Sequence, residues 1–153
     1  MAWLSRMLLG APRTAEEIVP TVDLANLTIC GLGNTATRTD IENRLGPASD
    51  YFMRRKGQLV YLQLGLQLSV DDHQMLVGFS VLGAPEILEQ YAWGPGRARR
   101  SPDEAWFVAR LGPPTARSSD DQELMLEWSR GTLFVGVDFS LSGQLNDLFV
   151  DYR

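Results

Sequence analysis

Hydrophobic and polar residues alternate along residues 60–70. One alternate set is entirely apolar and consists of Val60, Leu62, Leu64, Leu66, Leu68 and Val70. The set between them is mixed and includes Tyr61, Gln63 and Gln67. Successive side chains of a strand point to opposite faces, so this period of two predicts one half-buried strand of an antiparallel sheet. Residues 71–74 predict a turn, after which the returning strand has inward positions at Met75, Val77, Phe79 and Val81.

The same alternation returns near the C-terminus. Three strands are predicted there, separated by turns at residues 129–132 and 142–143. Their inward positions are Leu124, Leu126 and Trp128, then Leu133, Val135, Val137 and Phe139, and finally Leu148, Val150 and Tyr152. The residues between these positions are expected on the opposite face of the sheet.

A short helix is predicted before each set of strands. The first begins at Thr37, with Asp40 three residues on, and buries Ile41 and Leu45. The second begins at residues 101–104, where Ser101 and Glu104 are spaced as a capping box and a proline stands between them. Its buried stripe is expected to be Trp106, Phe107 and Leu111.

Both helices end in the same four residue types. Arg44-Leu45-Gly46-Pro47 ends the first, and Arg110-Leu111-Gly112-Pro113 ends the second. Glycine supplies a left-handed cap and proline cannot continue a helix, so each motif is a helix stop. Because the order of helix and strands also recurs, the chain is expected to contain a duplicated unit.

These patterns predict an α+β fold built from two helix-plus-antiparallel-meander repeats. The repeats would form one sheet of about six strands, with the helices on one face. The chain divides accordingly into an N-terminal helix and connection at residues 1–24, a first repeat at 25–82, a linker with a short helix at 83–100, and a second repeat at 101–153.

A helix closed by Leu-Gly-Pro and followed by a three-stranded meander, used twice over residues 25–153, resembles a known repeat. It is similar to that of β-lactamase inhibitory protein and of the small lipoprotein family of the outer-membrane assembly machinery. The resemblance implies a sheet that packs helices on one face and offers the other to a protein partner. No secretion signal, lipid-bearing cysteine or disulfide accompanies it here, so it implies neither a compartment nor a particular partner.

Composition narrows the classes of partner. The 153 residues are 44% hydrophobic, enough for a compact core, and carry a net charge of −5. An acidic protein lacks the basic face that nucleic acid requires, so nucleic acid is not an expected partner. The single cysteine, Cys30, forms no internal disulfide, and the expected location is cytoplasmic.

The N-terminal residues form a separate apolar segment. Trp3, Leu4, Met7 and Leu8 have helical spacing over a stretch too short to span a bilayer. No transmembrane segment is expected, and the segment is a candidate for a weak contact with a surface or a partner.

Few residues suggest catalysis or metal binding. Residues 31–36 run from Gly31 to Ala36 as Gly-Leu-Gly-Asn-Thr-Ala between a strand and a helix, the setting in which such a turn holds a dinucleotide pyrophosphate. The helix is short, however, and antiparallel strands follow it rather than another βα unit. His73 is the only histidine and stands in an acidic turn, where neither a triad nor a zinc site can be assembled. We therefore expect no catalytic residue, no cofactor and no metal.

The predicted function is that of a non-catalytic protein-binding module, such as an inhibitor, an immunity protein or an assembly factor. Exposed aromatic residues among amides and carboxylates are typical of protein interfaces. The expected contact surface is the sheet face opposite the apolar positions, with Tyr61, Gln63, Gln67, Glu127, Phe134, Asp138, Asp147 and Phe149. The alternatives are a nucleotide-binding enzyme that uses residues 31–36, a small-ligand carrier, or a face covered by the N-terminal segment or the linker helix.

Overall fold

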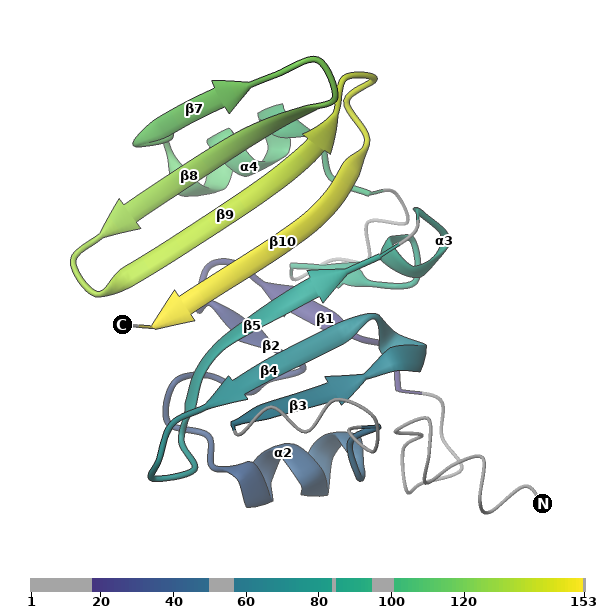
Figure 1. Ribbon diagram of the computed structural model, residues 1–153, viewed down its shortest axis with the longest axis vertical. Helices are drawn as coiled ribbons and strands as arrows, with labels where there is room; N and C mark the ends of the chain where they lie inside the picture. Colours follow the sequence, from purple (N-terminus) through teal and green to yellow (C-terminus); the bar gives the residue numbers. More distant parts are fainter. Residues whose placement is uncertain (1–17, 50–56, 84, 95–100, 153) are drawn as a thin grey trace.

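Seven strands form one antiparallel sheet in the computed structural model, which describes residues 18–49, 57–83, 85–94 and 101–152 (Figure 1). Every neighbouring pair of strands is antiparallel. The order across the sheet is β3 (Gln58–Tyr61), β4 (Leu66–Val70), β5 (Leu76–Leu82), β10 (Leu145–Tyr152), β9 (Leu133–Ser140), β8 (Glu123–Arg130) and β7 (Ala116–Ser119). The two sets of strands predicted from the sequence therefore meet where β5 pairs with β10.

The α+β class is confirmed, but the prediction of one sheet of about six strands is wrong. The main sheet has an additional edge strand, β7, in which all four residues are exposed. Without buried positions β7 has no hydrophobic alternation, which is why the sequence pattern does not predict it.

The structure also contains a second, three-stranded sheet, which the sequence pattern did not predict. Its strands are β1 (Thr21–Asp23), β2 (Thr28–Ile29) and β6 (Ala92–Trp93), with β1 in the centre. β2 pairs with β1 antiparallel, whereas β6 pairs with it parallel. These strands are too short to show a periodic pattern.

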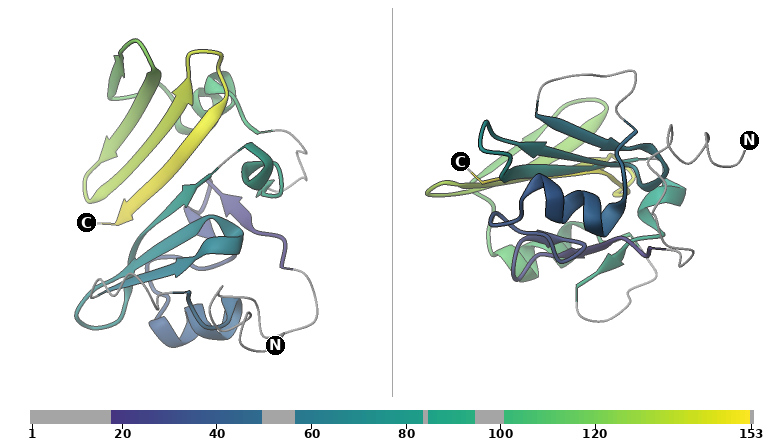
Figure 2. Two further views of the ribbon diagram at one scale, coloured as in Figure 1. Left: turned by 45° about the vertical axis from the view of Figure 1, so that its right-hand side comes forward. Right: turned by 90° about the horizontal axis from the view of Figure 1, so that it is seen from below.

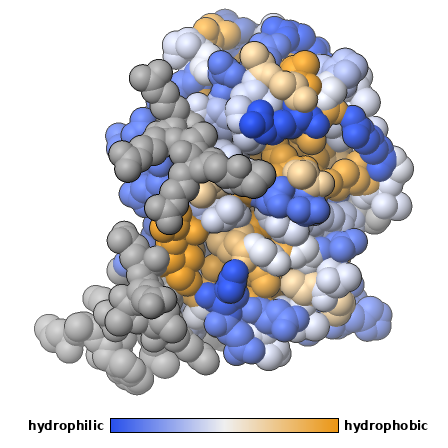
Figure 3. Space-filling view, turned by 180° about the vertical axis from the view of Figure 1, so that it is seen from behind, coloured by the Kyte–Doolittle hydropathy of each residue, from blue (hydrophilic) through white to orange (hydrophobic). Residues whose placement is uncertain are grey.

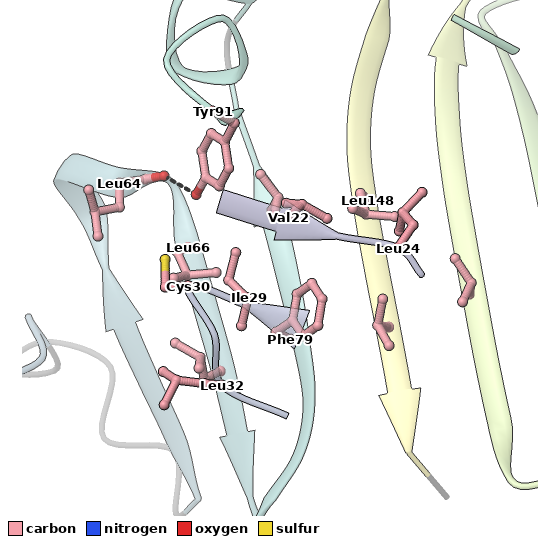
Figure 4. Close-up of a cluster of buried hydrophobic side chains, with 14 of the residues drawn as sticks. Val22, Leu24, Ile29, Cys30, Leu32, Leu64, Leu66, Phe79, Tyr91 and Leu148 are labelled. Atoms are coloured by element: carbon pink, nitrogen blue, oxygen red, sulfur yellow. Dashed lines mark hydrogen bonds between the residues drawn. The ribbon is translucent and has the colours of Figure 1, made fainter. Parts of the chain in front are cut away.

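The two longer helices and the small sheet lie on the same side of the main sheet (Figure 2). α2 (Arg38–Leu45) and α4 (Glu104–Leu111) contribute the buried side chains Ile41, Leu45, Phe107 and Leu111 to the core. Val22 and Ile29 of the small sheet lie close to Leu66, Phe79 and Leu148 of the main sheet (Figure 4). The other side of the main sheet therefore carries no described helix or strand.

An aromatic chain connects the layers. Trp93 of β6 makes edge contacts with Trp106 and Phe107 of α4, with ring centroids 6.1 and 6.2 Å apart. Phe107 continues to Phe139 of β9 at 5.8 Å. Some hydrophobic residues remain visible between hydrophilic ones on this helix-bearing side (Figure 3).

The predicted strand over residues 60–70 is a hairpin. A 3-10 turn, η1 (Leu62–Leu64), separates β3 from β4, and Gly65 follows it with φ +58°. The turn reverses the phase, so Leu59 and Tyr61 are fully buried, while Leu62 is 57% exposed and Val60 points away from the core. The prediction that Val60 and Leu62 face inward is therefore wrong.

Two β-bulges, one in β5 and one in β10, also change which side chains of these strands face the core. In β5, Ser69 pairs with Gly78 and Val70 with Leu76, so Val77 is an extra residue and Leu76 is buried in its place. In β10, Asp138 pairs with Asp147 and Phe139 with Leu145, which makes Asn146 the extra residue. Such bulges keep apolar residues on the core face on both sides of an irregularity.

The helix ends follow the predictions more closely than the helix starts. Thr37 and Asp40 form a reciprocal capping box at α2. At α4 the N-cap is Asp103, whose side chain accepts a hydrogen bond from the backbone N–H of Trp106, so the predicted capping role of Ser101 is wrong. Gly46 and Gly112 end the two helices at φ +83° and +79°.

The connection between the two sets of strands contains α3 (Pro85–Leu88), a single helical turn. Leu88 and the adjacent Tyr91 are buried, and the Tyr91 hydroxyl donates to the carbonyl of Leu64 (Figure 4). Trp3, Leu4, Met7 and Leu8 lie outside the described residues. Within the described residues, no helix is both long and apolar enough to cross a membrane.

Candidate functional site

The candidate site is the face of β8, β9 and β10 that points away from the helices. Its residues alternate with the buried positions of these strands and are all partly exposed. No described helix or strand lies over it (Figure 1). We call it the β8–β10 face, and it includes Glu123, Met125, Glu127, Phe134, Asp138, Asp147, Phe149 and Asp151.

Two stacked aromatic rings form the apolar part of this face. Phe134 and Phe149 lie with ring centroids 5.5 Å apart and planes inclined by 29°. Gly136 stands directly opposite Phe149 on β9, and the Phe149 ring fills the space that a Cβ atom at Gly136 would occupy. The glycine therefore lets the ring lie flat on the sheet.

Carboxylates surround the aromatic pair. Asp138 on β9 stands directly opposite Asp147 on β10, and its other cross-strand neighbour is Met125 on β8. Side chains opposite one another across an antiparallel pair have Cβ atoms about 5 Å apart, and like charges there destabilise the sheet. Glu123 and Glu127 occupy the same face of β8, one alternate position on either side of Met125.

The surroundings of Asp138 oppose its ionisation. Burial, reinforced by the carboxylates of Glu123, Asp147 and Glu127, raises the pKa of Asp138 to about 6. Among the described residues, no hydrogen-bond donor reaches its Oδ1 atom, which is inaccessible to water. Burial also raises the pKa of Asp147, against the effect of a hydrogen bond that its carboxylate accepts from the backbone N–H of Gly83.

The bulge at Asn146 brings the two aspartates together. Leu145 and Leu148 are both buried although three positions separate them, which strict alternation does not allow. The extra residue returns Asp147 to the open face, opposite Asp138. Bulges often redirect side chains next to functional sites.

The structure places most of the predicted contact residues on the open side of the main sheet. Five of them lie within the β8–β10 face, and Gln67 lies on the same side, on β4. Gln63 is exposed but belongs to the turn η1 rather than to a strand.

Tyr61 does not belong to the open side. It is fully buried on the core face, and its hydroxyl donates a hydrogen bond to the carbonyl of Gly46 at 2.9 Å. The error follows from the phase reversal at η1, which places Tyr61 inward and Val60 outward. Tyr61 therefore belongs to the helix end, and a partner-binding role for it is withdrawn.

The sequence pattern missed Glu123 and Met125. The acidic run Asp120, Asp121 and Glu123 is typical of a solvated turn, whereas in the structure β8 begins at Glu123. The carboxylate of Asp120 accepts hydrogen bonds from the backbone N–H groups of Gln122 and Glu123. The turn therefore ends at Gln122, and Glu123 is the first residue of the strand. Extending the alternation of Leu124 and Leu126 by one residue would have placed Glu123 in phase with Glu127.

Residues 31–36 do not form a dinucleotide-binding turn of the expected kind. The preceding strand, β2, has two residues and pairs antiparallel with β1. At the start of α2, the carboxylate of Asp40 already accepts the backbone N–H of Thr37 at 2.8 Å. An acidic side chain at this helix N-terminus disfavours a phosphate group there.

The remaining candidates have structural roles. Cys30 is buried, which raises the pKa of its thiol, and its carbonyl accepts a hydrogen bond from Arg44 Nε at 3.1 Å. His73 lies exposed in the turn whose backbone is held by the Asp71 carboxylate. Within the described part of the chain, no cluster of histidine, cysteine and carboxylate side chains has the geometry of a metal site.

Two cavities lined by described residues lie outside the β8–β10 face. One of about 390 Å³ is open and is lined by residues that include Gly31, Asp40 and Arg44. The other, about 240 Å³ and mostly apolar, lies between the β3–β4 turn and Ile87. The apolar cavity is smaller than the roughly 300–1,000 Å³ typical of small-molecule sites.

Comparison with known proteins informs the fold alone. No protein-family model matches the sequence, and no curated protein matches it. The chain is similar in structure to a DUF4309 family protein, YjgB, from Bacillus subtilis subsp. subtilis str. 168. The TM-score is 0.54 at 13% sequence identity, and the match covers 80% of this chain and 83% of that chain. At this level of identity the likeness shows a shared fold.

Proposed function

We propose that this protein is a non-catalytic protein-binding module and that its contact surface is the β8–β10 face. The observation that carries the proposal is the stacked pair of Phe134 and Phe149, partly exposed on a sheet face that no described element covers. Aromatic residues are enriched at protein interfaces, where they supply rigid contact area at little cost in conformational entropy. The arrangement agrees with the resemblance to sheet-based inhibitory and assembly proteins.

The unfavourable electrostatic interaction between Asp138 and Asp147 supports the same proposal. Asp138 and Asp147 stand opposite each other on a half-buried surface, where their repulsion opposes folding. A contact surface explains this arrangement, because binding sites commonly retain interactions that reduce stability.

We further propose that the two halves of the chain are copies of one unit. The two helix caps have the same backbone conformation, at Gly46 and Gly112. The carbonyl of each cap accepts a hydrogen bond from an aromatic side chain on a following strand, Tyr61 Oη or Trp128 Nε1, at 2.9 Å in both cases. In this view β3, β4 and β5 correspond to β8, β9 and β10, and β7 is an addition to the second copy.

A charge-reversal experiment tests the contact surface. Full-length protein and two variants, Glu127→Lys and Glu89→Lys, are used to capture partners from an extract of the source cells, followed by cross-linking and mass spectrometry. Both substitutions change the net charge equally, but Glu127 lies in the β8–β10 face and Glu89 is exposed beyond the end of α3. We expect Glu127→Lys alone to lose the partner and the cross-links to map to β8–β10. Equal capture by both variants, with cross-links elsewhere, would reject the proposal.

A further inference from the structure

The charges on the β8–β10 face have one sign. Glu123, Glu127, Asp138 and Asp147 supply four carboxylates, and Asp151, opposite Phe134, supplies a fifth. No lysine or arginine in the described strands points to this side of the sheet. Arg117 and Arg130 of β7 and β8 occupy core-face positions, where they bind Glu104 and the carbonyl of Leu111. The described basic residues are therefore directed to the helix-bearing side.

Within the described residues, no ion pair involves Glu123, Glu127, Asp138 or Asp147. The ion pairs seen in this part of the chain, Arg38 with Glu42 and Arg117 with Glu104, lie on the helix side. Asp138 in addition has an oxygen atom without a hydrogen-bond donor, directly opposite a second carboxylate. A bound cation would reduce the repulsion among these carboxylates.

The aromatic pair determines which kind of cation fits. The stacked rings of Phe134 and Phe149 present an apolar, electron-rich surface beside the carboxylates. A guanidinium group stacks on such a ring and at the same time donates to a carboxylate, whereas a hydrated metal ion does neither well. The combination of rings and carboxylates suits a protein segment with basic and apolar side chains.

We infer that the partner of the β8–β10 face is a basic protein segment, with arginine or lysine side chains against Asp138 and Asp147 and an apolar or guanidinium group on the Phe134–Phe149 stack. This inference rests on the proposed function and specifies its partner. A second copy of this chain docked through the same face is disfavoured because the two faces would repel each other. Nucleic acid and anionic membranes are disfavoured for the same reason.

The pKa of Asp138 gives the interaction a pH dependence. Its carboxylate is flanked by Glu123 and Glu127 on β8 and by Asp147 on β10, which together with burial raise its pKa to about 6. Arginine does not titrate in this range. Binding is therefore expected to weaken as the pH falls from 7.5 to 5.5, because Asp138 loses its charge.

Peptide titrations of the full-length, isotope-labelled protein test the inference. The probe is a short synthetic peptide that alternates arginine and leucine, and the matched peptide has glutamate in place of arginine. We expect the arginine peptide to shift amide resonances of β8–β10 and the glutamate peptide to leave them unchanged. The double variant Asp138→Asn, Asp147→Asn should weaken binding about tenfold or more, whereas Glu86→Gln, Glu89→Gln, which removes the same charge near α3, should weaken it little.

Three outcomes would overturn the inference: no binding of the arginine peptide, shifts confined to other elements, or equal weakening by both double variants. The last would mean that net charge alone attracts the peptide. The capture experiment separates this inference from the proposed function. A partner cross-linked to β8–β10 through an acidic or uncharged segment leaves the proposed function standing and rejects the basic segment.

Discussion

Asp138 illustrates how a single residue on the open face reduces stability. Its pKa in the folded protein, about 6, lies above the usual value of 3.8. The folded state therefore binds this proton more tightly than the unfolded state, and the penalty is fully present above about pH 6. As the pH falls from 6 towards 3.8, protonation of Asp138 relieves the penalty.

The variant Asp138→Asn should accordingly be more stable than the wild type at pH 8. We expect a gain of about 1 kcal/mol, since two pKa units correspond to about 2.7 kcal/mol before solvent screening of this partly exposed group. The gain should shrink at pH 5 and disappear near pH 3.8. Urea denaturation at these three pH values measures it, with Glu89→Gln as an exposed control. A gain that is independent of pH would contradict the assigned ionisation.

Tyr61 illustrates the opposite case, a residue with a structural role in place of the predicted contact role. Its hydroxyl is the donor to the buried carbonyl of Gly46, so Tyr61→Phe leaves that carbonyl without this bond. We expect a loss of about 1–2 kcal/mol in the free energy of unfolding. Partner capture should be unchanged, because the side chain lies on the core face. Loss of capture by a stably folded Tyr61→Phe protein would restore Tyr61 to the contact surface.

At the scale of elements, the sequence predicted helix ends well and strand phase only locally. Gly-Pro ends α2 and α4 where expected, because the positive φ of the glycine and the missing N–H of the proline act within one or two residues. Alternation, in contrast, assigns faces only as far as the next irregularity. Gly65, Val77 and Asn146 each change the phase, and only Gly65 is marked by its residue type.

Because alternation assigns faces only as far as the next irregularity, only part of the candidate site could be predicted from the sequence. Phe134, Asp138 and Phe149 lie on the predicted side of the sheet because β9 is regular and because β10 is regular beyond its bulge. Tyr61 was assigned wrongly because a turn interrupts the pattern just after it. The predicted meander already makes β9 and β10 neighbours, but the pairing of Asp138 with Asp147 depends on the bulge at Asn146, which no residue type in the sequence marks.

The N-cap of α4 provides a test at the element scale. Asp103 caps the helix, so Asp103→Ala should cost about 1 kcal/mol. Ser101 was the predicted cap, but its hydroxyl is buried without a hydrogen-bond partner among the described residues, so Ser101→Ala should be neutral or slightly stabilising. Thermal or chemical denaturation of both variants measures the difference. Equal losses for the two substitutions would contradict the assigned cap.

At the scale of the molecule, the two sets of strands share one sheet and one core. β5 pairs with β10 over residues 78–82, and Val81 and Leu148, which stand opposite each other, are fully buried. Neither half can therefore unfold without exposing apolar surface of the other. The described core forms one continuous cluster that extends across both halves.

We expect a single cooperative unfolding transition. Tryptophan fluorescence and far-ultraviolet circular dichroism should report the same midpoint in urea, since the buried tryptophans and the strands lie in one core. Leu148→Ala, at the junction, should lower the free energy of unfolding by about 2–5 kcal/mol and leave one transition. Two separate transitions in the wild type would show that the halves are independent.

The pairing of β5 with β10 also affects the order in which the protein can be completed on the ribosome. β5 ends at Leu82, but the strand that covers its edge begins at Leu145. At about 5–20 residues per second, residues 83–144 occupy on the order of several seconds of synthesis. During that interval the edge of β5 has no partner from its own chain, and an unpaired edge can pair with another nascent chain. The nascent first half is therefore the stage at which we expect pairing of β5 with another chain to compete most with folding.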